Sequence, residues 1–251
     1  MKYLLFLLIP FQFLIAQNST KTGHIIYQVS LTEPFFYSDA YKSYDEKNYQ
    51  ETLDRDSLIN AVELGVAFTK KSSQSFLLKE YDTITNNLDY GALYRVNGHT
   101  NYTYNVATKT ATASMDYWDK LVSISVDLNS KWKIDFSKTK KIDGYTCYYA
   151  TYTGKNLWYP VTGEPIYAWF TTDLPLPFGP LHYHGLPGLI IELNIENIRY
   201  TAKKIAFNDT YSSKLKPKKL SKHEVLTDEE FINTREDIKR RYKRIIIQGG
   251  N

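Results

Sequence analysis

Two histidines separated by a single residue, His182 and His184, are the first candidates for chemistry in this chain. If this stretch is extended, both rings point to the same side, which is the simplest two-ligand geometry for zinc or copper. A metal site needs a third ligand, and sequence spacing supplies none, although Glu192, Asp173 or Cys147 could approach in three dimensions. The sequence favours loop histidines that are satisfied by hydrogen bonds, so we predict no metal and no cofactor, with His182 and His184 as the weak metal candidates.

Cys147 is the single cysteine of the chain, which excludes an internal disulfide and any site built from several cysteines. Because it lies among aromatic residues in a strand-like segment, we expect a small buried hydrophobe and not a nucleophile.

The motifs of the common hydrolases are absent from the sequence. It holds no Gly-x-Ser-x-Gly, no His-Glu-x-x-His and no glycine-rich phosphate loop. Acids such as Asp173 and Glu164 could pair for glycoside hydrolysis, but any chain with 27 carboxylates offers such pairs. We therefore predict a protein that is not an enzyme, with an unrecognised periplasmic hydrolase and a metal-binding protein that uses His182 and His184 as the alternatives.

The N-terminus has the pattern of a secretion signal. Lys2 is followed by an apolar run over residues 4–15 and by the small residue Ala16. The run is shorter than the roughly 20 residues that a membrane-spanning helix needs. We predict a cleaved signal peptide over residues 1–16, one β-rich domain over residues 17–251, and export to the periplasm or the medium. No lipobox cysteine follows the run, and no later segment has membrane length, so we expect no transmembrane segment after cleavage.

Composition and charge narrow the classes of protein and partner. The chain has 251 residues, 43% of them hydrophobic, with 22 tyrosines and a formal net charge of +4. This composition is typical of a folded, strand-rich protein. Residues 214–244 are basic but interrupted by acids, which is typical of a solvated helix face, although such a segment could also attract polyanions. A nucleic-acid partner is not expected, because the net charge is far below that of a dedicated binder.

Period-two alternation of apolar residues predicts many short strands. The alternation is clearest over residues 25–31, 122–128 and 189–195, and a turn at Asn197 returns the chain through residues 200–205 as a hairpin. Further strands are expected over residues 62–69, 75–80, 93–96, 102–106, 145–152 and 166–171. Connections this short favour an antiparallel meander, because parallel strands need long crossovers. The predicted fold class is mainly β: a curled antiparallel sheet or half-open barrel.

Two helices are predicted beside the strands. Residues 38–60 are polar with apolar residues at loosely helical spacing, which predicts a surface helix or a long excursion. A C-terminal helix is indicated by Thr227 followed by three acids, of which Glu230 completes a capping box, and by basic residues over 239–244 that complement the helix dipole.

Four of the nine prolines lie between Pro175 and Gly188, together with three glycines. Prolines lack an N–H donor and fix φ, while glycines permit tight turns, so this segment is a shaped loop that leads into the strand over residues 189–195. Such a loop is either a rigid structural corner or a recognition surface. Because glycine and proline carry backbone geometry more than chemistry, we favour the corner. We expect φ > 0 at Gly188, and we expect Glu192 to lie on the polar face of the following strand.

The loop ends in Gly185-Leu186-Pro187-Gly188-Leu189-Ile190, the hexapeptide of the GLPGLI family, a Porphyromonas-type secreted family of Bacteroidetes envelope proteins. The chain resembles that family from about Trp132 to Phe207. The other matching residues are Trp132, Ile134, Ile142, Gly144, Tyr145, Cys147, Ala150, Ala168, Trp169, Phe170, Thr171, Pro175, Gly179 and Pro180. The resemblance implies a β-rich fold akin to the half-open barrels of periplasmic lipoprotein carriers. The family has no established enzymatic activity and no agreed ligand, so the resemblance carries over no catalytic residues.

The strands beside the loop are aromatic on both faces. If one face lines the concave side of a half-open barrel, it forms a cleft for an apolar small molecule, a lipid or an extended peptide; the alternative is a core covered on both sides. We predict an exported, non-enzymatic envelope protein that binds an apolar ligand or an envelope protein. The candidate binding residues are Trp169, Pro175, Gly179, Pro180, Gly185, Leu186, Pro187, Gly188, Leu189 and Ile190.

Overall fold

The computed structural model describes residues 22–33, 46–78, 87–98, 100–117, 120–129, 131–154, 165–208 and 224–233. The expected signal peptide, the lysine-rich residues 214–222 and the basic residues 239–244 lie outside these ranges. None of the described helices is long and apolar enough to cross a membrane.

The described strands form one mixed, 12-stranded sheet. In chain order they are β1 (Gly23–Leu31), β2 (Glu63–Phe68), β3 (Ser72–Leu77), β4 (Asn101–Asn105), β5 (Thr110–Tyr117), β6 (Lys120–Asp127), β7 (Trp132–Ile142), β8 (Tyr145–Tyr152), β9 (Tyr167–Thr171), β10 (Leu189–Ile195), β11 (Ile198–Phe207) and β12 (Glu224–Thr227). Their order across the sheet is β12-β6-β5-β4-β3-β2-β1-β11-β10-β9-β8-β7. Two meanders, β2–β6 and β7–β11, are therefore joined through β1.

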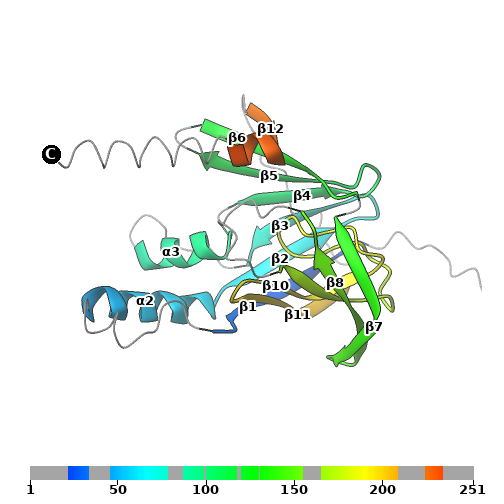
Figure 1. The fold of residues 1–251 in the computed structure, drawn as a ribbon, viewed down its shortest axis with the longest axis horizontal. Coiled ribbons are helices and arrows are strands. Elements are labelled where there is room, and N and C mark those ends of the chain that lie inside the picture. Colours follow the sequence, from blue (N-terminus) through cyan, green and yellow to red (C-terminus); the bar gives the residue numbers. More distant parts are fainter. Residues whose placement is uncertain are drawn as a thin grey trace, which may run out of the picture.

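The predicted fold class is confirmed, with two refinements. The sheet is curled, since β7 and β8 run in a different direction from β4–β6 (Figure 1), and β12 and β7 form its two edges, so it is open and not a closed barrel. The meanders are antiparallel as expected, but β12 pairs with β6 in parallel, which makes the sheet mixed.

One predicted strand is wrong. Residues 93–96 fall at the end of helix α3 (Asn87–Arg95), where Ala92, Leu93 and Val96 are buried. The four residues Leu93-Tyr94-Arg95-Val96 are too few to distinguish a strand from a helix, and the spacing of Ala92 and Val96 is that of one helical face. Three strands were not predicted: β5, which is rich in small and polar residues, the short β12, and β7, an edge strand none of whose residues is fully buried.

Helix α2 (Glu46–Ile59) confirms the helix expected within residues 38–60, and it packs against α3 (Figure 1). Helix α3 ends in a turn that is favourable for its sequence. Asn97 adopts the left-handed region at φ 54°, which asparagine tolerates, and the Gly98 N–H donates to Leu93 O at 2.8 Å. This turn directs the chain from α3 back into β4.

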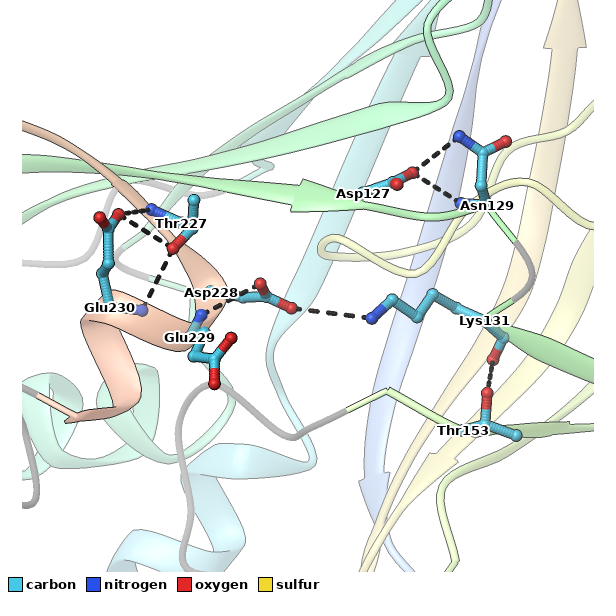
Figure 2. Close-up of polar contacts among 8 residues, drawn as sticks. All are labelled: Asp127, Asn129, Lys131, Thr153, Thr227, Asp228, Glu229 and Glu230. Carbon is cyan, nitrogen blue, oxygen red and sulfur yellow. Dashed lines mark hydrogen bonds and ion pairs between the residues drawn. The ribbon is translucent and has the colours of Figure 1, made fainter.

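The predicted C-terminal helix begins directly after β12 and is described over residues 228–233. Figure 2 shows its capping box: Thr227 N donates to Glu230 Oε2 at 2.7 Å, and Glu230 N donates to Thr227 Oγ1 at 3.2 Å. Asp228 Oδ2 lies 3.9 Å from Lys131 Nζ, and Phe231 is 1% exposed. The helix is thus fastened to the segment that precedes β7.

Strand β10 departs from the expected one-sided burial, because all seven of its residues are buried. Its pairing with β9 shifts register between Ile190 and Glu192, which marks a bulge. Glu192 lies on the polar face as expected, beside Lys140 and Arg199, but it is only 7% exposed. Apolar and polar residues do alternate along β10, but both of its faces are covered. The loop before β10 covers one face, and side chains of neighbouring strands cover the other.

Candidate functional site

Residues 174–188, which connect β9 to β10, fold into the concave side of the sheet, and we call them the plug. Four backbone hydrogen bonds close the plug on itself and on β10: Tyr183 N to Pro180 O at 3.1 Å, Gly185 N to Pro177 O at 3.0 Å, Leu189 N to Leu174 O at 2.9 Å and Ile190 N to Phe178 O at 3.0 Å. The turns satisfy the polar backbone groups of this buried, proline-rich segment.

The plug requires glycine for two different reasons. A Cβ placed on Gly188 would lie 2.0 Å from Thr171 O, and one on Gly179 would lie 2.2 Å from Tyr183 O. Both positions therefore lack room for any side chain. The expected positive φ is found at Gly185, at 90°, and not at Gly188. Gly188 is needed for close approach to β9 and not for backbone handedness.

Aromatic and polar contacts tie the plug to strands from both meanders. The Phe178 ring stacks on Phe68 of β2 at 5.1 Å, and the His184 ring stacks on Tyr104 of β4 at 4.6 Å. Trp132 Nε1 of β7 donates to His184 O at 2.8 Å. Since β2, β4 and β7 belong to distant parts of the sheet, the plug fills the interior that the curled sheet encloses.

His184 is a structural residue of the plug. Its Nδ1 accepts the Gly179 N–H at 3.0 Å and its Nε2 lies 2.9 Å from Leu181 O. A neutral ring with its proton on Nε2 satisfies both partners. Burial lowers the pKa of His184 to about 3, so the ring stays neutral. Both nitrogens are occupied, and the two-ligand metal geometry expected for an extended 182–184 segment does not form.

His182 differs from His184 although it lies two residues away. It is completely buried, and neither ring nitrogen has a hydrogen-bond partner. The ring centroid lies 4.1 Å from that of Tyr183 and 6.0 Å from that of Tyr102. Burial, with His184 nearby, lowers its pKa to about 3. Among the described residues, no three His, Cys, Asp or Glu side chains are placed to hold a metal ion.

The ten predicted binding residues do not share one surface. Within the plug and β10, six are buried: Gly179, Pro180, Leu186, Gly188, Leu189 and Ile190. Pro175 and Pro187 are exposed, while Gly185 and Trp169 are half-buried. Trp169 faces the outer side of the sheet, where Lys140 Nζ lies 4.6 Å from its ring centroid. Four of the six residues of the hexapeptide are thus interior packing, and the hexapeptide is separate from Trp169.

The outer side of β7–β11 carries an ionic cluster around Glu192. Glu192 Oε1 lies 3.0 Å from Lys140 Nζ and 3.8 Å from Arg199 Nε, and it accepts a hydrogen bond from Asn194 Nδ2 at 2.9 Å.

Cys147, on β8, is fully buried as expected, and burial raises the pKa of its thiol to about 11. A thiol with a raised pKa is a poor nucleophile, in agreement with a structural cysteine.

A cavity of about 310 Å³ lies beside the plug on the concave side. Its walls come from β2, β3, the turn after α3, the start of β4 and one plug residue. The lining residues are Leu64, Gly65, Val66, Gln74, Ser75, Phe76, Leu77, Asn97, Gly98, Thr100, Asn101, Tyr102 and Leu181. None of these described residues carries a formal charge.

Two cavity residues hold sparsely populated backbone conformations. Leu181, the plug residue in the wall, has φ 56°, and Asn97 has φ 54°. A left-handed leucine is strained, because its Cβ crowds the backbone, and such strain concentrates at ligand sites. This conformation places the buried Leu181 on the cavity wall, which residues of the α3 turn also line.

Sequence reasoning missed this cavity, although its residues lie in predicted elements. The strand predicted over residues 62–69 contains Leu64 and Val66, and the Asn97-Gly98 pair after an apolar stretch is a typical end of a helix. The Asn97-Gly98 pair could have indicated a helix that ends at the cavity. The prediction of a strand over residues 93–96 concealed this helix end.

The family model described as "Protein of unknown function (Porph_ging)" matches residues 160–192, a segment that holds the whole plug and the start of β10. No curated protein matches the chain. Among solved structures, PNGF-II in space group C2 is similar with a TM-score of 0.47 and 14% identity, over 82% of this chain and 31% of that chain. PNGF-II in space group P21 gives 0.45 and 14%, over 83% and 32%. The chain spans about a third of the length of these solved structures.

Proposed function

We propose that this protein is an exported, non-enzymatic envelope protein that binds a small apolar or amphipathic molecule in the cavity beside the plug. The observation that carries the proposal is the cavity itself, with a volume of about 310 Å³ and walls that include Leu64, Val66, Leu77 and Leu181. Ligand pockets span roughly 300–1,000 Å³ and are mainly apolar with a few polar groups. Burial of apolar ligand surface against these walls would provide the binding free energy.

The plug interior is a less suitable place for a ligand. Side chains of the plug and the sheet fill it, as the stacked pairs Phe178–Phe68 and His184–Tyr104 demonstrate. A ligand there would have to displace packed side chains with backbone-bonded neighbours. The role that we assign to the plug is to support one wall of the cavity through Leu181.

The sequence context supports export and envelope location. Residues 185–190 are the GLPGLI hexapeptide, and the family model matches around it over residues 160–192. We propose that the chain is a GLPGLI-type envelope protein whose residues 1–16 are removed on secretion. N-terminal sequencing of the native protein is expected to begin at Gln17, and recovery of Met1 in a membrane fraction would contradict export with cleavage.

A dye-binding experiment tests the cavity. N-phenyl-1-naphthylamine is an uncharged dye whose fluorescence rises in apolar surroundings. The purified protein is expected to bind it saturably. The Leu77→Trp variant replaces an aliphatic side chain of the cavity wall with a larger indole ring, and it is expected to weaken dye binding at least tenfold.

Leu78→Trp is the matched control, because Leu78 is the next residue along, is exposed and does not line the cavity. It should bind the dye as the parent does. Equal loss in both variants, or dye binding that Leu77→Trp leaves unchanged, would place the apolar site elsewhere. Thermal melts of both variants show that each is folded.

A further inference from the structure

Strands β3 and β4 separate at the cavity. They are neighbours in the sheet, but they are paired at only three positions: Ser72 with Asn105, Ser73 with Tyr104 and Gln74 with Thr103. Strand β3 continues to Leu77 and stays paired with β2, whereas no further pair of described residues joins it to β4. The sheet is therefore split between β3 and β4 from Ser75 onward.

A serine side chain takes the place of the next pair. The register would bring Ser75 opposite Tyr102, but Tyr102 N donates to Ser75 Oγ at 2.9 Å and Ser75 Oγ donates to Tyr102 O at 3.3 Å. The backbone groups of Tyr102 that face β3 are thus satisfied by a side chain. The backbone of β3 beyond Gln74 is not bonded to the backbone of β4 among the described residues.

The direction of the Leu77 backbone groups follows from the ladder on the other side of β3. In an antiparallel ladder, the N–H and C=O of successive residues point alternately to one neighbouring strand and to the other. Thr69 N donates to Ser72 O at 2.8 Å at one end of the β2–β3 hairpin, and Leu78 N donates to Glu63 O at 3.3 Å at the other end. Residues 72 and 78 therefore bond toward β2. By alternation, the N–H and C=O of Leu77 point away from β2 and into the split.

The cavity extends into this split. It is lined by the successive residues 74–77 of β3 and by the successive residues Asn101 and Tyr102 of β4. Successive residues of a strand face opposite sides of the sheet, so a cavity that meets all of them passes from the concave side in between the two strands. The edge of β3 that carries the N–H and C=O of Leu77 therefore borders the cavity.

An extended peptide residue complements such an edge. Its own N–H and C=O point to the same side, and they can exchange two hydrogen bonds with the C=O and N–H of Leu77, as a paired strand does. The cavity wall around the split contains the apolar side chains of Leu64, Val66 and Leu181. No described wall residue carries a formal charge, so an uncharged residue inside a peptide is favoured over a charged chain end.

We propose that the cavity binds a peptide through one extended residue with an apolar side chain, whose N–H donates to Leu77 O and whose C=O accepts from Leu77 N. This inference rests on the proposed function and deepens it, because it names the class of ligand and the backbone groups that recognise it. The apolar wall provides the contact for the side chain, and the edge of β3 provides the specificity for a peptide.

The first test compares two ligands on the parent protein. N-acetyl-leucine N-methylamide is an uncharged, blocked residue, and its ester analogue has oxygen in place of the leucine N–H. Both are titrated against bound N-phenyl-1-naphthylamine at pH 7. The blocked leucine is expected to displace the dye, and the ester analogue should bind about three- to tenfold more weakly, because Leu77 O loses its donor. Equal displacement by the two ligands, or no displacement by the blocked leucine, would overturn the inference.

The second test compares two variants of the protein. Leu77→Pro and Leu77→Val leave the same number of side-chain carbons, but only Leu77→Pro removes the N–H. Since this N–H points away from β2, the proline breaks no bond of the β2–β3 ladder. With each result corrected for the affinity of the variant for the dye, Leu77→Pro should bind the blocked leucine about three- to tenfold more weakly than Leu77→Val does. Equal affinities in two folded variants would contradict the role of the Leu77 N–H.

Thermal melts establish that both variants are folded, and if Leu77→Pro does not fold, the two ligands on the parent protein decide. Failure of this inference is distinct from failure of the proposed function. Dye binding that remains sensitive to Leu77→Trp leaves the proposed function standing even where the blocked leucine does not bind. Loss of that sensitivity would instead remove the cavity as the site.

Discussion

The plug and the cavity wall lie side by side and share Leu181, but they differ in how completely they are packed. In the plug, His184 satisfies both ring nitrogens and Gly188 allows backbone contact with β9. In the cavity wall, space is left open, the Thr100 hydroxyl has no partner and Leu181 holds a strained φ of 56°. The plug is closely packed, although His182 within it leaves both ring nitrogens without a partner, whereas the cavity wall encloses open space. We therefore propose the cavity, and not the signature loop, as the binding site.

The largest expected effect comes from adding one methyl group at matched glycines in the two regions. Gly188→Ala would place Cβ 2.0 Å from Thr171 O, so strand β9 must move, and we expect a loss of more than about 4 kcal/mol of folding free energy or no folded protein. Gly98→Ala in the cavity wall meets only side-chain atoms at 3.2 Å or more and should cost about 1 kcal/mol at most. Chemical denaturation measures both. Equal effects would remove the distinction between plug and wall.

A second comparison uses the two histidines at neutral pH. His184→Phe leaves the Gly179 N–H and Leu181 C=O without their partner, and we expect a loss of about 2–4 kcal/mol. His182→Phe keeps a flat ring against Tyr102 and removes a buried group whose nitrogens have no partner, so stability should stay the same or rise. Denaturation curves at pH 7.5 distinguish the two. A similar loss in both variants would mean that His182 also has a structural partner, such as a buried water.

The same pair gives a pH dependence with a definite sign. The pKa of each buried histidine is about 3 in the folded protein, against 6.5 for a free side chain. As pH falls below 6.5, the unfolded chain takes up protons that the folded protein does not, so folding stability decreases. Each histidine contributes a slope of up to about 1.4 kcal/mol per pH unit until pH approaches 3. His182→Phe should remove one such slope between pH 6 and 4, and parallel curves for parent and variant would contradict this.

The smallest expected effect extends the comparison to the outer face of the sheet. Glu192→Gln keeps an acceptor for Asn194 but weakens the pairs with Lys140 and Arg199, which are partly exposed, and we expect a cost of about 1–2 kcal/mol. The exposed Glu229→Gln serves as the control and should change stability by less than about 0.5 kcal/mol. A Glu192→Gln variant as stable as the parent would show that the ion pairs of Glu192 with Lys140 and Arg199 do not stabilise the fold.

The sequence was informative where local pattern and tertiary structure agree. Strands such as β1 and the β10–β11 hairpin, the capping box at Thr227 and the burial of Cys147 all follow from alternation, capping chemistry or residue type. Local pattern could not reveal that the plug turns inward, because its glycines and prolines fit a surface corner equally well. Glu192 lies on the polar outer face as expected, but its low exposure could not be predicted, because the side chains that cover it come from other strands.

The candidate site was the least predictable part of the molecule. Its wall combines β2, β3, the α3 turn and Leu181, which are widely separated in the sequence, and no residue type among them signals chemistry. An empty volume is a property of how elements pack. The split between β3 and β4 can be recognised only when the pairing of the strands is known.

The position of β1 in the sheet has a consequence for how the chain folds. Each meander pairs strands that follow one another closely, so each can form from local contacts soon after its residues are available. Strand β1 pairs with β2 but also with β11, and the Tyr27 hydroxyl donates to Ile190 O, 163 positions later in the sequence. Closing so long a segment is entropically costly and slow. The joining of the two meanders should therefore be the late step, and until the residues of β11 are available, β1 would have one edge unpaired.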